Sequence, residues 1–525
     1  MRFIMKWTKA CKRGASLLAA LLLAFGSAQA VSTENSLTLG IISVSTQFMN
    51  PLIPVEREFM SLQSLVYEGL VELDDDYLPR PKLCRSWETS AGGGTWYFYL
   101  REGITFHDGT PLTANDVVAT VKAILDLAKS PSSGNAGAYA SLQYFITDIS
   151  ANDNLTVVIK TNRTNFGFLY AMTFPILPAA LVQAENPPGT GPYKMDQFVP
   201  KDFLILSAYD GWWRGKAAMD TIMTIFHTAN RELISSFEYN RVDAVATRSL
   251  TAAQYRSGIS SLNLSYRTRQ LETLMMNNRV RELSDVRVRK AIRYAVNIQD
   301  ILSSVYMDMA QRTDTPMMPG TWMHSDIPEA FQYDPEKAKQ LLDEAGWVDS
   351  DGDGIRDTVI DGNKANLRLR FLVYEEQDNS VRMMAANKIA GMLKSIGIET
   401  TPTLVGFTDV RDRLKAGNFD IALASFNMDT VPDPGFLLMS NNTANYMRYN
   451  SKEMDNLFAH LRQCLTQEEY RNTLFQIQSL FAEDCPFMCL YYRKGAILTR
   501  KMFTDARDLR EPDVLRGIAE GLETR

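Results

Sequence analysis

Four aspartates within nine residues make the stretch GWVDSDGDGIRD (residues 346–357) the first candidate for chemistry. A calcium loop of the EF-hand type needs oxygen ligands at positions 1, 3 and 5 and a bidentate glutamate at position 12. Counted from Asp349, Asp351 and Asp353 stand in place, but position 12 is Ile360, which has no side-chain oxygen. The stretch therefore predicts an acidic turn. Weak calcium binding stays open, although we expect neither a metal nor a cofactor.

Histidines and cysteines are the other candidate ligands and nucleophiles. The four histidines form no His-Glu-x-x-His pair, and His107-Asp108 has no serine or cysteine nucleophile in a recognisable motif, so we interpret it as a turn. The thiols of Cys84, Cys464, Cys485 and Cys489 favour disulfides, in one of three connectivities, or buried free thiols. His460, four residues before Cys464, also allows a zinc site, but the paired short spacing of zinc ligands is missing.

The N-terminus has the pattern of a secretory signal. Basic residues precede the apolar run 15–25, and Ala28-Gln-Ala30 supplies the small residues of a cleavage site. The apolar run is too short to span a bilayer comfortably. We therefore expect residues 1–30 to be removed near Ala30 and the remainder to be a soluble protein of the periplasm or another extracytoplasmic compartment.

The charge balance excludes one class of partner. Removal of residues 1–30 takes five of the 55 basic residues and none of the 61 acidic ones, which leaves a net charge of −11. Nucleic-acid binding depends on clustered lysine and arginine, so nucleic acid is not expected as a partner. The mature length of 495 residues predicts two or three domains.

The elements that would position these residues are clearest in the C-terminal half. A helix opens at Asp334-Pro335 and stops at Gly346, and another over 285–306 is predicted to have Ser284 as its cap. Beyond them, strands alternate with helices, which predicts an α/β unit with parallel pairing: strand 367–374, helix 380–396, strand 398–405, helix 409–417 capped by Thr408, and strand 419–426.

The N-terminal half shows shorter strands and one glycine-rich loop. Strands are expected at 36–43, 154–162 and 203–208, and a helix at Ala114 with Thr113 as its cap. The loop GTGPY at 189–193 opens no helix and lacks the lysine of a phosphate-binding loop, so nucleotide binding is not expected.

Six segments stand in the order typical of one family. They are YEGLVELDDDYLPRPKLCRSWETS, FHDGTPLTANDVV, GTGPYK, DVRVRKAIRYAV, DPEKAKQLLDEAGWVDSDGDGIRD and FDIALASF followed by PDP. Over nearly the whole mature chain the sequence resembles the family 5 extracellular solute-binding proteins, the peptide- and nickel-type receptors of ABC importers. The resemblance implies a periplasmic-binding-protein-like α/β fold, with two lobes joined by a hinge and an extra inserted domain.

The resemblance also implies domain boundaries, because GTGPYK marks the return of the chain to the first lobe in this family. Lobe I is expected to combine residues 31–68, 188–275 and 490–525. The inserted domain is expected over residues 69–187, and lobe II over residues 276–489.

The function that the resemblance implies is capture without catalysis. The expected protein is a monomeric receptor that closes its lobes on short peptides and delivers them to the membrane permease of an ABC importer. An oligosaccharide, an opine or a nickel chelate is the alternative ligand. A secreted hydrolase, the alternative of another class, would need a nucleophile–base pair or a metal triad, and the sequence shows neither.

Peptide-binding members of the family hold the ammonium group of the ligand with an aspartate just after a strand and an aromatic residue. Counting forward from Phe419 places the aromatic residue at Phe426 and the aspartate at Asp429, whereas counting backward from Pro434 reaches Thr430. The loop is thus one residue longer than usual, and Phe426 replaces a frequent tryptophan. Ser425 and Asn427 are the neighbouring candidates.

Further candidates come from residue type alone. Tyr446 and Trp322 are aromatic platforms that, with Asn427, would suit a sugar, although Trp322 fits a core position equally well. Five methionines crowd one region and predict either an adaptable apolar pocket or simple core filling: Met307, Met309, Met317, Met318 and Met323.

Overall fold

The computed structural model describes residues 35–53, 55–90, 92–129, 139–162, 165–258, 260–326, 332–360, 362–376, 381–504 and 507–521. The expected signal segment, residues 1–30, lies outside the described residues, so its removal stays a prediction. Within the described ranges, no helix combines the length and apolar character that crossing a membrane requires.

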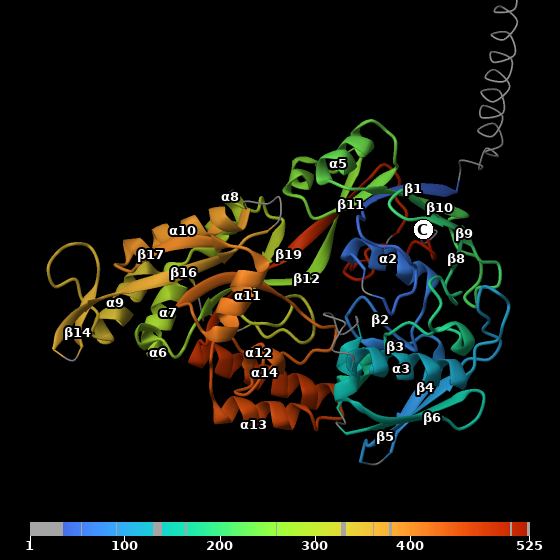
Figure 1. The fold of residues 1–525 in the computed structure, drawn as a ribbon, viewed down its shortest axis with the longest axis horizontal. Helices are drawn as coiled ribbons and strands as arrows, with labels where there is room; N and C mark the ends of the chain where they lie inside the picture. Colours follow the sequence, from blue (N-terminus) through green and yellow to red (C-terminus); the bar gives the residue numbers. More distant parts are fainter. Residues whose placement is uncertain are drawn as a thin grey trace, which may run out of the picture.

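One large mixed sheet organises the molecule (Figure 1). Its strands follow the order β17-β16-β18-β12-β19-β11-β1-β10-β9-β8, with β13 paired to β19. Their bounds are β1 Ser36–Ile42, β8 Tyr193–Val199, β9 Phe203–Ala208, β10 Thr221–His227, β11 Ala244–Thr247, β12 Leu262–Met276, β13 Ala310–Arg312, β16 Arg368–Tyr374, β17 Glu399–Val405, β18 Ile421–Asn427 and β19 Phe487–Thr499.

Two long strands connect the two halves of this sheet. The first part of β12, from Leu262 to Arg267, pairs with β19, which there also pairs with β11 on the side of β1, β10, β9 and β8. The second part, from Leu271 onward, pairs with β19 and with β18. The register of β12 against β19 shifts between these parts. The first half-sheet (β8, β9, β10, β1 and β11) and the second half-sheet (β16, β17 and β18) therefore meet through β12 and β19, as Figure 1 shows.

Helices cover the second half-sheet and build its core. Val288, Ala291 and Ile292 of α7 are buried, as their helical spacing predicts, and they share a core with Phe371 of β16. The helices are α2 Arg57–Val66, α3 Ala114–Lys129, α4 Phe168–Ala171, α5 Asn230–Glu238, α6 Arg281–Ser284, α7 Val286–Ala295, α8 Ile298–Ser304, α9 Pro335–Glu344, α10 Val381–Ser395, α11 Phe407–Ala416, α12 Gly435–Leu438, α13 Lys452–Leu461 and α14 Gln467–Asp484.

A separate four-stranded sheet lies beside the first half-sheet (Figure 1). Its order is β4-β5-β7-β6, and Trp96, Phe98 and Leu100 alternate along β5 to face its core. Phe168 packs on this aromatic face. The small strands are β2 Val71–Leu73, β3 Pro79–Pro81, β4 Cys84–Thr89, β5 Thr95–Leu100, β6 Ile146–Ala151, β7 Thr156–Thr161, β14 Asp357–Ile360 and β15 Asn363–Asn366.

The parallel α/β unit is confirmed, because β16 pairs in parallel with both β17 and β18. The start of α9 is confirmed too: the Asp334 carboxylate accepts the Lys337 N–H at 2.8 Å, and Pro335 occupies the first turn. The helix α3 begins at Ala114 as expected, but Thr113 does not cap it by accepting. Its hydroxyl instead donates to the Asp116 carboxylate at 2.8 Å.

Two predicted helix starts are wrong. Ser284 does not cap the following helix, because its hydroxyl donates to the carbonyl of Arg281, while the Asp285 carboxylate accepts the N–H of Arg287. The predicted single helix over 285–306 is instead two helices, α7 and α8. The Asn297 side chain accepts the N–H of Asp300 and so caps the start of α8. Thr408 lies inside α11, whose cap is Gly406.

The four cysteines are buried free thiols, which decides between the two predicted alternatives. Burial raises the pKa of the Cys84 thiol to about 12. Among the described residues, His460 and the cysteines form no group that could hold a metal ion.

The GTGPY loop packs closely against the end of α2 and against the turn at His107. A methyl group on Gly189 would overlap the carbonyl oxygen of Val66, and one on Gly191 would lie 2.5 Å from that of Leu65. The ring of His107 contacts the same loop, with Nε2 2.9 Å from the Gly191 carbonyl oxygen and Nδ1 accepting the Gly189 N–H at 3.3 Å. The His107-Asp108 turn and the GTGPY loop therefore contact each other, and both have a structural role.

We predict that Gly189→Ala lowers the free energy of unfolding by roughly 3 kcal/mol, because the added methyl group must displace backbone. Gly391→Ala is the matched control: it lies on the exposed side of α10 with open space around its Cα, so it should raise stability by up to about 1 kcal/mol. Urea denaturation measures both. A Gly189 variant as stable as the wild type would contradict the close approach.

Burial lowers the pKa of His107 to about 4. An unfolded histidine takes up its proton near pH 6.5, so acidification from pH 6.5 to 4 favours the unfolded chain, by roughly 3 kcal/mol at most. His107→Gln keeps a donor for Gly191 but does not titrate. We expect its unfolding free energy to fall less than that of the wild type over this pH range. Parallel slopes in the two proteins would contradict the assignment.

Candidate functional site

A cavity of about 430 Å³ opens between the first half-sheet, the four-stranded sheet region and the loop after β18. Its wall comes from α2, the segment 68–82, Trp212 and Arg214, and the C-terminal segment 510–520. A second cavity of about 30 Å³ adjoins it, and Arg269, Asp429 and Thr430 line both. These three residues therefore stand at the junction of the two spaces.

Asp429 lies two residues beyond the end of β18. Its Oδ1 accepts the backbone N–H of Thr430 at 2.6 Å and that of Val431 at 3.4 Å. No described residue donates a hydrogen bond to Oδ2. The loop thus fixes the carboxylate through one oxygen, while the side chain of Asp429 is exposed.

Arg269 extends from β12 to the same point. One of its terminal nitrogens donates to the Thr430 hydroxyl at 3.2 Å, and its backbone N–H donates to Glu511 at 3.1 Å. Its Nε is buried and has no hydrogen-bond partner in the described chain. A buried donor without a partner is costly, so this nitrogen favours a ligand that brings an acceptor oxygen.

Other charges on the wall are already compensated. Lys82 lies 3.7 Å from both Glu68 and Glu72, and Arg214 pairs with Glu72 at 2.5 Å. The carboxylate of Glu68 also accepts hydrogen bonds from the indole of Trp213 and the hydroxyl of Thr190. These groups shape the cavity without needing a ligand.

Asp513 differs from its neighbours on the same wall. It accepts a hydrogen bond from the Ser64 hydroxyl at 3.0 Å and forms no ion pair with a described residue. Burial raises the pKa of the Asp513 carboxyl, since the surrounding cations only partly offset the loss of solvent. It lines the large cavity, but among the described residues no hydrogen bond links it to Asp429, so we assign it no role in ligand binding.

The six residues that the sequence singled out have different surroundings. Asp429 lines both cavities, and the other five line neither. Phe426 is buried and stacks on Tyr446, with ring centroids 6.4 Å apart. Asn427 is exposed at the end of β18. The indole of Trp322 donates to the Tyr170 hydroxyl at 3.0 Å.

Ser425 belongs to a buried charge network beside the register shift. Its hydroxyl accepts from Gln270 at 3.3 Å and from Arg382 at 3.4 Å. Arg382 and Arg493 both contact the fully buried Glu272, at 2.8 and 3.0 Å. Burial alone would raise the pKa of Glu272, but the two arginines outweigh it and bring the pKa to about 2. The carboxylate is therefore ionised at any ordinary pH.

Sequence reasoning missed Arg269 and the C-terminal wall. A sequence signal for Arg269 exists, because Arg267 and Arg269 stand two residues apart in β12, whose later residues are mostly apolar. No comparable signal marks the segment 510–520, which reaches the cavity only through tertiary contacts. One of these is the bridge between Arg267 and Arg510.

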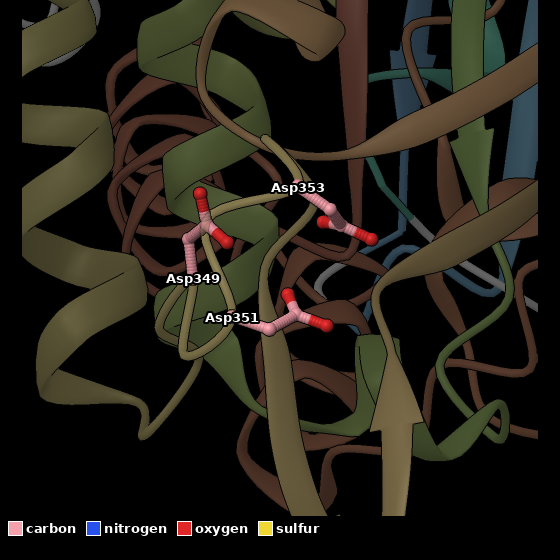
Figure 2. A group of neighbouring side chains, drawn as sticks. All are labelled: Asp349, Asp351 and Asp353. Atoms are coloured by element: carbon pink, nitrogen blue, oxygen red, sulfur yellow. The ribbon is translucent and has the colours of Figure 1, made fainter.

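The acidic turn is shown in Figure 2. The carboxylates of Asp349, Asp351 and Asp353 approach within 4.8 Å of one another and are exposed. Asp349 accepts the N–H groups of Gly352 and Gly354, at 2.9 and 3.1 Å, which is the hydrogen bonding of a turn.

A cation already accompanies this turn. The Lys364 ammonium contacts Asp351 and lies 3.3 Å from Asp357. Position 12 of the calcium pattern, Ile360, belongs to β14 and supplies no side-chain oxygen. The arrangement suits the predicted turn without a metal ion.

Comparison with known proteins identifies the class of this fold. The Bacillus subtilis oligopeptide-binding protein AppA in complex with a nonapeptide superposes with a TM-score of 0.67 at 23% identity, covering 91% of this chain and 98% of that chain. Campylobacter jejuni NikZ in complex with Ni(L-His) gives a TM-score of 0.69 at 22% identity, covering 89% and 94%. The fold is thus that of the two-lobed periplasmic binding proteins, with additional small sheets.

Residues 79–448 match the model of the bacterial extracellular solute-binding proteins, family 5 Middle, and the chain belongs to this family. Over 482 residues it is 27% identical to the oligopeptide-binding protein AppA of Bacillus subtilis, covering 87% of this chain and 86% of that protein. It is 26% identical to the nickel-binding periplasmic protein of Escherichia coli over 369 residues, covering 67% and 68%. The heme-binding protein A of Haemophilus influenzae is 23% identical, with 88% of each chain covered.

Membership makes the protein a solute-binding receptor of an ABC transporter, in a family of binding proteins rather than enzymes. The named ligands of its relatives differ: oligopeptide, nickel and heme. Family membership therefore leaves the ligand of this receptor to be argued from its own cavity.

The acidic turn yields a prediction on metal dependence. Because hydrogen bonds and Lys364 already hold the turn, EDTA should leave the melting temperature unchanged within about one degree, whereas a bound structural calcium would stabilise the fold by mass action. Differential scanning fluorimetry with EDTA, and then with excess calcium, measures this. A fall of several degrees that calcium reverses, and that Asp351→Asn abolishes, would show a calcium site.

Proposed function

We propose that this receptor captures short peptides by their first residue. The observation that carries the proposal is the pair of incompletely bonded groups at the cavity junction, Oδ2 of Asp429 and Nε of Arg269. Thr430 adjoins both, since it donates to the aspartate and accepts from the arginine. The first residue of a peptide presents an ammonium group and, three bonds from its nitrogen, a carbonyl oxygen, which complement these two groups.

The energetics favour such a ligand. A desolvated ammonium needs a charged acceptor, and the pair is strong only when geometry is good. Asp429 is held in place by its own loop, so little freedom is lost when the ligand binds. The cavity of about 430 Å³ lies within the range of small-ligand sites.

Contacts between the parts of the chain support closure of two lobes around the ligand. Asp429 and Thr430 approach the cavity from the proposed lobe II, and α2 with the C-terminal segment from lobe I. Closure in this scheme is a shift of an open–closed equilibrium by the free energy of ligand contacts, with bending at β12 and β19.

An aromatic contact beyond the cavity supports the same closure. Phe166 packs against Trp322 and Tyr470, with centroids 5.8 and 6.1 Å apart, and its N–H donates to the carbonyl of Cys464. The Tyr470 hydroxyl in turn donates to Pro432, three residues beyond Asp429. We propose that this contact between the inserted domain and lobe II forms when the lobes close.

The proposal includes the domain boundaries that the resemblance implies: lobe I at 31–68, 188–275 and 490–525, the inserted domain at 69–187, and lobe II at 276–489. It also includes export of the protein, a monomeric state and delivery of the ligand to a membrane permease. The sugar alternative loses support from Trp322, because this indole is bonded to Tyr77 and Tyr170 and lines neither cavity. Nickel chelates, opines and oligosaccharides remain as comparison ligands for the test.

Asp429 is exposed here, and the proposed lobe closure would remove its pair with the ammonium from water. We predict that Asp429→Asn weakens binding of short peptides by roughly 2–5 kcal/mol, because the variant leaves the enclosed ammonium without a charged acceptor. N-acetylated peptides lack that charge, so they should bind the wild type poorly and lose little on mutation. Isothermal titration calorimetry with paired free and acetylated peptides measures this. Asp412→Asn is the control, since it removes the same charge from an exposed position on α11.

Each other outcome has a distinct meaning. Equal affinity for free and acetylated peptides would remove the ammonium role of Asp429. Binding of a nickel chelate, heme, an opine or a sugar, with no peptide bound, would remove the peptide assignment. Steady cleavage of the peptides during the titration would favour the hydrolase instead.

A further inference from the structure

The small cavity beside Asp429 has an unusual wall. Its volume is about 30 Å³. Four methionines from two loops line it: Met317, Met318 and Met323, which precede residues 327–331, and Met428, which follows β18. All four are buried. Tyr77, Tyr492 and Phe436 complete the apolar side.

The polar groups of this wall, apart from Asp429 and Arg269, are occupied. The Tyr492 hydroxyl donates to the carbonyl of Pro316 at 2.7 Å, and Asp433 pairs with Arg462 at 3.0 Å. The space therefore offers an apolar lining, with the incompletely bonded Asp429 and Arg269 at its entrance.

The two cavities can receive different parts of the ligand at its first residue, the peptide chain in one and the side chain in the other. If Asp429 holds the ammonium and Arg269 the carbonyl oxygen, the side chain leaves from the carbon between them. Both groups line both cavities, so the peptide chain can continue into the large cavity while the side chain enters the small one.

Methionine suits a wall that must change its shape. A space of about 30 Å³ holds roughly one water molecule, so a larger side chain requires the wall to move. Methionine is unbranched, with three rotatable side-chain bonds and a polarisable thioether, and it repacks around ligands of different shape. Rotamer changes of these side chains enlarge the cavity without displacing backbone.

We infer that the four methionines form a selectivity pocket for the first side chain of the ligand, one that favours long apolar side chains such as leucine, methionine and phenylalanine. The inference rests on the proposed peptide function and adds a substrate preference to it. Two members of the predicted methionine cluster have no part in the pocket: Met307 is exposed, and Met309 packs in a separate core with Leu233 and Phe237 of α5.

The test is a calorimetric series of tripeptides X-Ala-Ala, with X as Gly, Ala, Leu, Met or Phe. Wild-type affinity should rise at least tenfold from Gly to Leu or Met, since buried side-chain carbons contribute most of the difference. The double variant Met318→Ile, Met428→Ile keeps apolar volume but stiffens the wall by β-branching. It should reduce the Leu-over-Gly preference to threefold or less. Met309→Ile is the matched control and should keep the full preference.

A second measurement does not depend on the stability of the variants. In wild-type protein labelled at the methionine methyl groups, Met-Ala-Ala should shift the NMR resonances of Met318 and Met428 more than Gly-Ala-Ala does, and Met309 should not respond.

Equal affinities across the series, or equal spectra with the two peptides, would overturn the pocket while the peptide function stood. Failure of every free peptide to bind, together with binding of a chelate or sugar, would overturn the peptide function and the pocket with it.

Discussion

The connection of two half-sheets through β12 and β19 is the constraint on which the rest of the molecule depends. Each strand contributes its two ends to different halves, so neither half can be completed without both strands. The register shift between Arg267 and Leu271 places an irregularity where the two halves meet. Arg269, which lines both cavities, lies within this irregular stretch. The register shift at the proposed hinge therefore also positions a side chain of the cavity wall.

Buried charge gives this junction a defined structure. Glu272 has no solvent exposure and contacts Arg382 of α10 and Arg493 of β19. Such a network costs desolvation, and removing one partner leaves a buried charge unpaired. From Gln270 the network extends to Arg57 of α2, whose guanidinium lies 3.4 Å from the Gln270 side chain. Polar contacts thus connect both half-sheets with α2, the helix that lines the cavity. Few substitutions of these buried residues would be tolerated.

Local patterns in the sequence predict much of the fold and little of the site. Alternating strands and helices, and the Asp334-Pro335 start, depend on neighbours within a few residues, and the structure agrees with them. The break between α7 and α8 was missed because apolar spacing continues across Asn297. Asp429 could be found from its place after β18. The alternation of Arg267 and Arg269 marks Arg269 only as a polar position of a strand, and its place beside Thr430 depends on the pairing of β12 with β18, about 160 positions apart. Phe426 and Ser425 lie on β18 itself, and their side chains contact Tyr446 and Arg382.

The path of the C-terminal segment has a consequence for the order in which the protein acquires its site. Residues 510–520 line the large cavity together with α2, and Pro512 accepts a hydrogen bond from Ser61, 451 positions earlier. Contacts between such distant positions form late, since the loop between them must first be closed. During synthesis, the units contiguous in sequence, such as the four-stranded sheet and the β16–β18 unit, can fold while residues 510–520 are still absent. The cavity wall is finished only when residues 510–520 have emerged, so a nascent receptor lacks this side of the cavity until then.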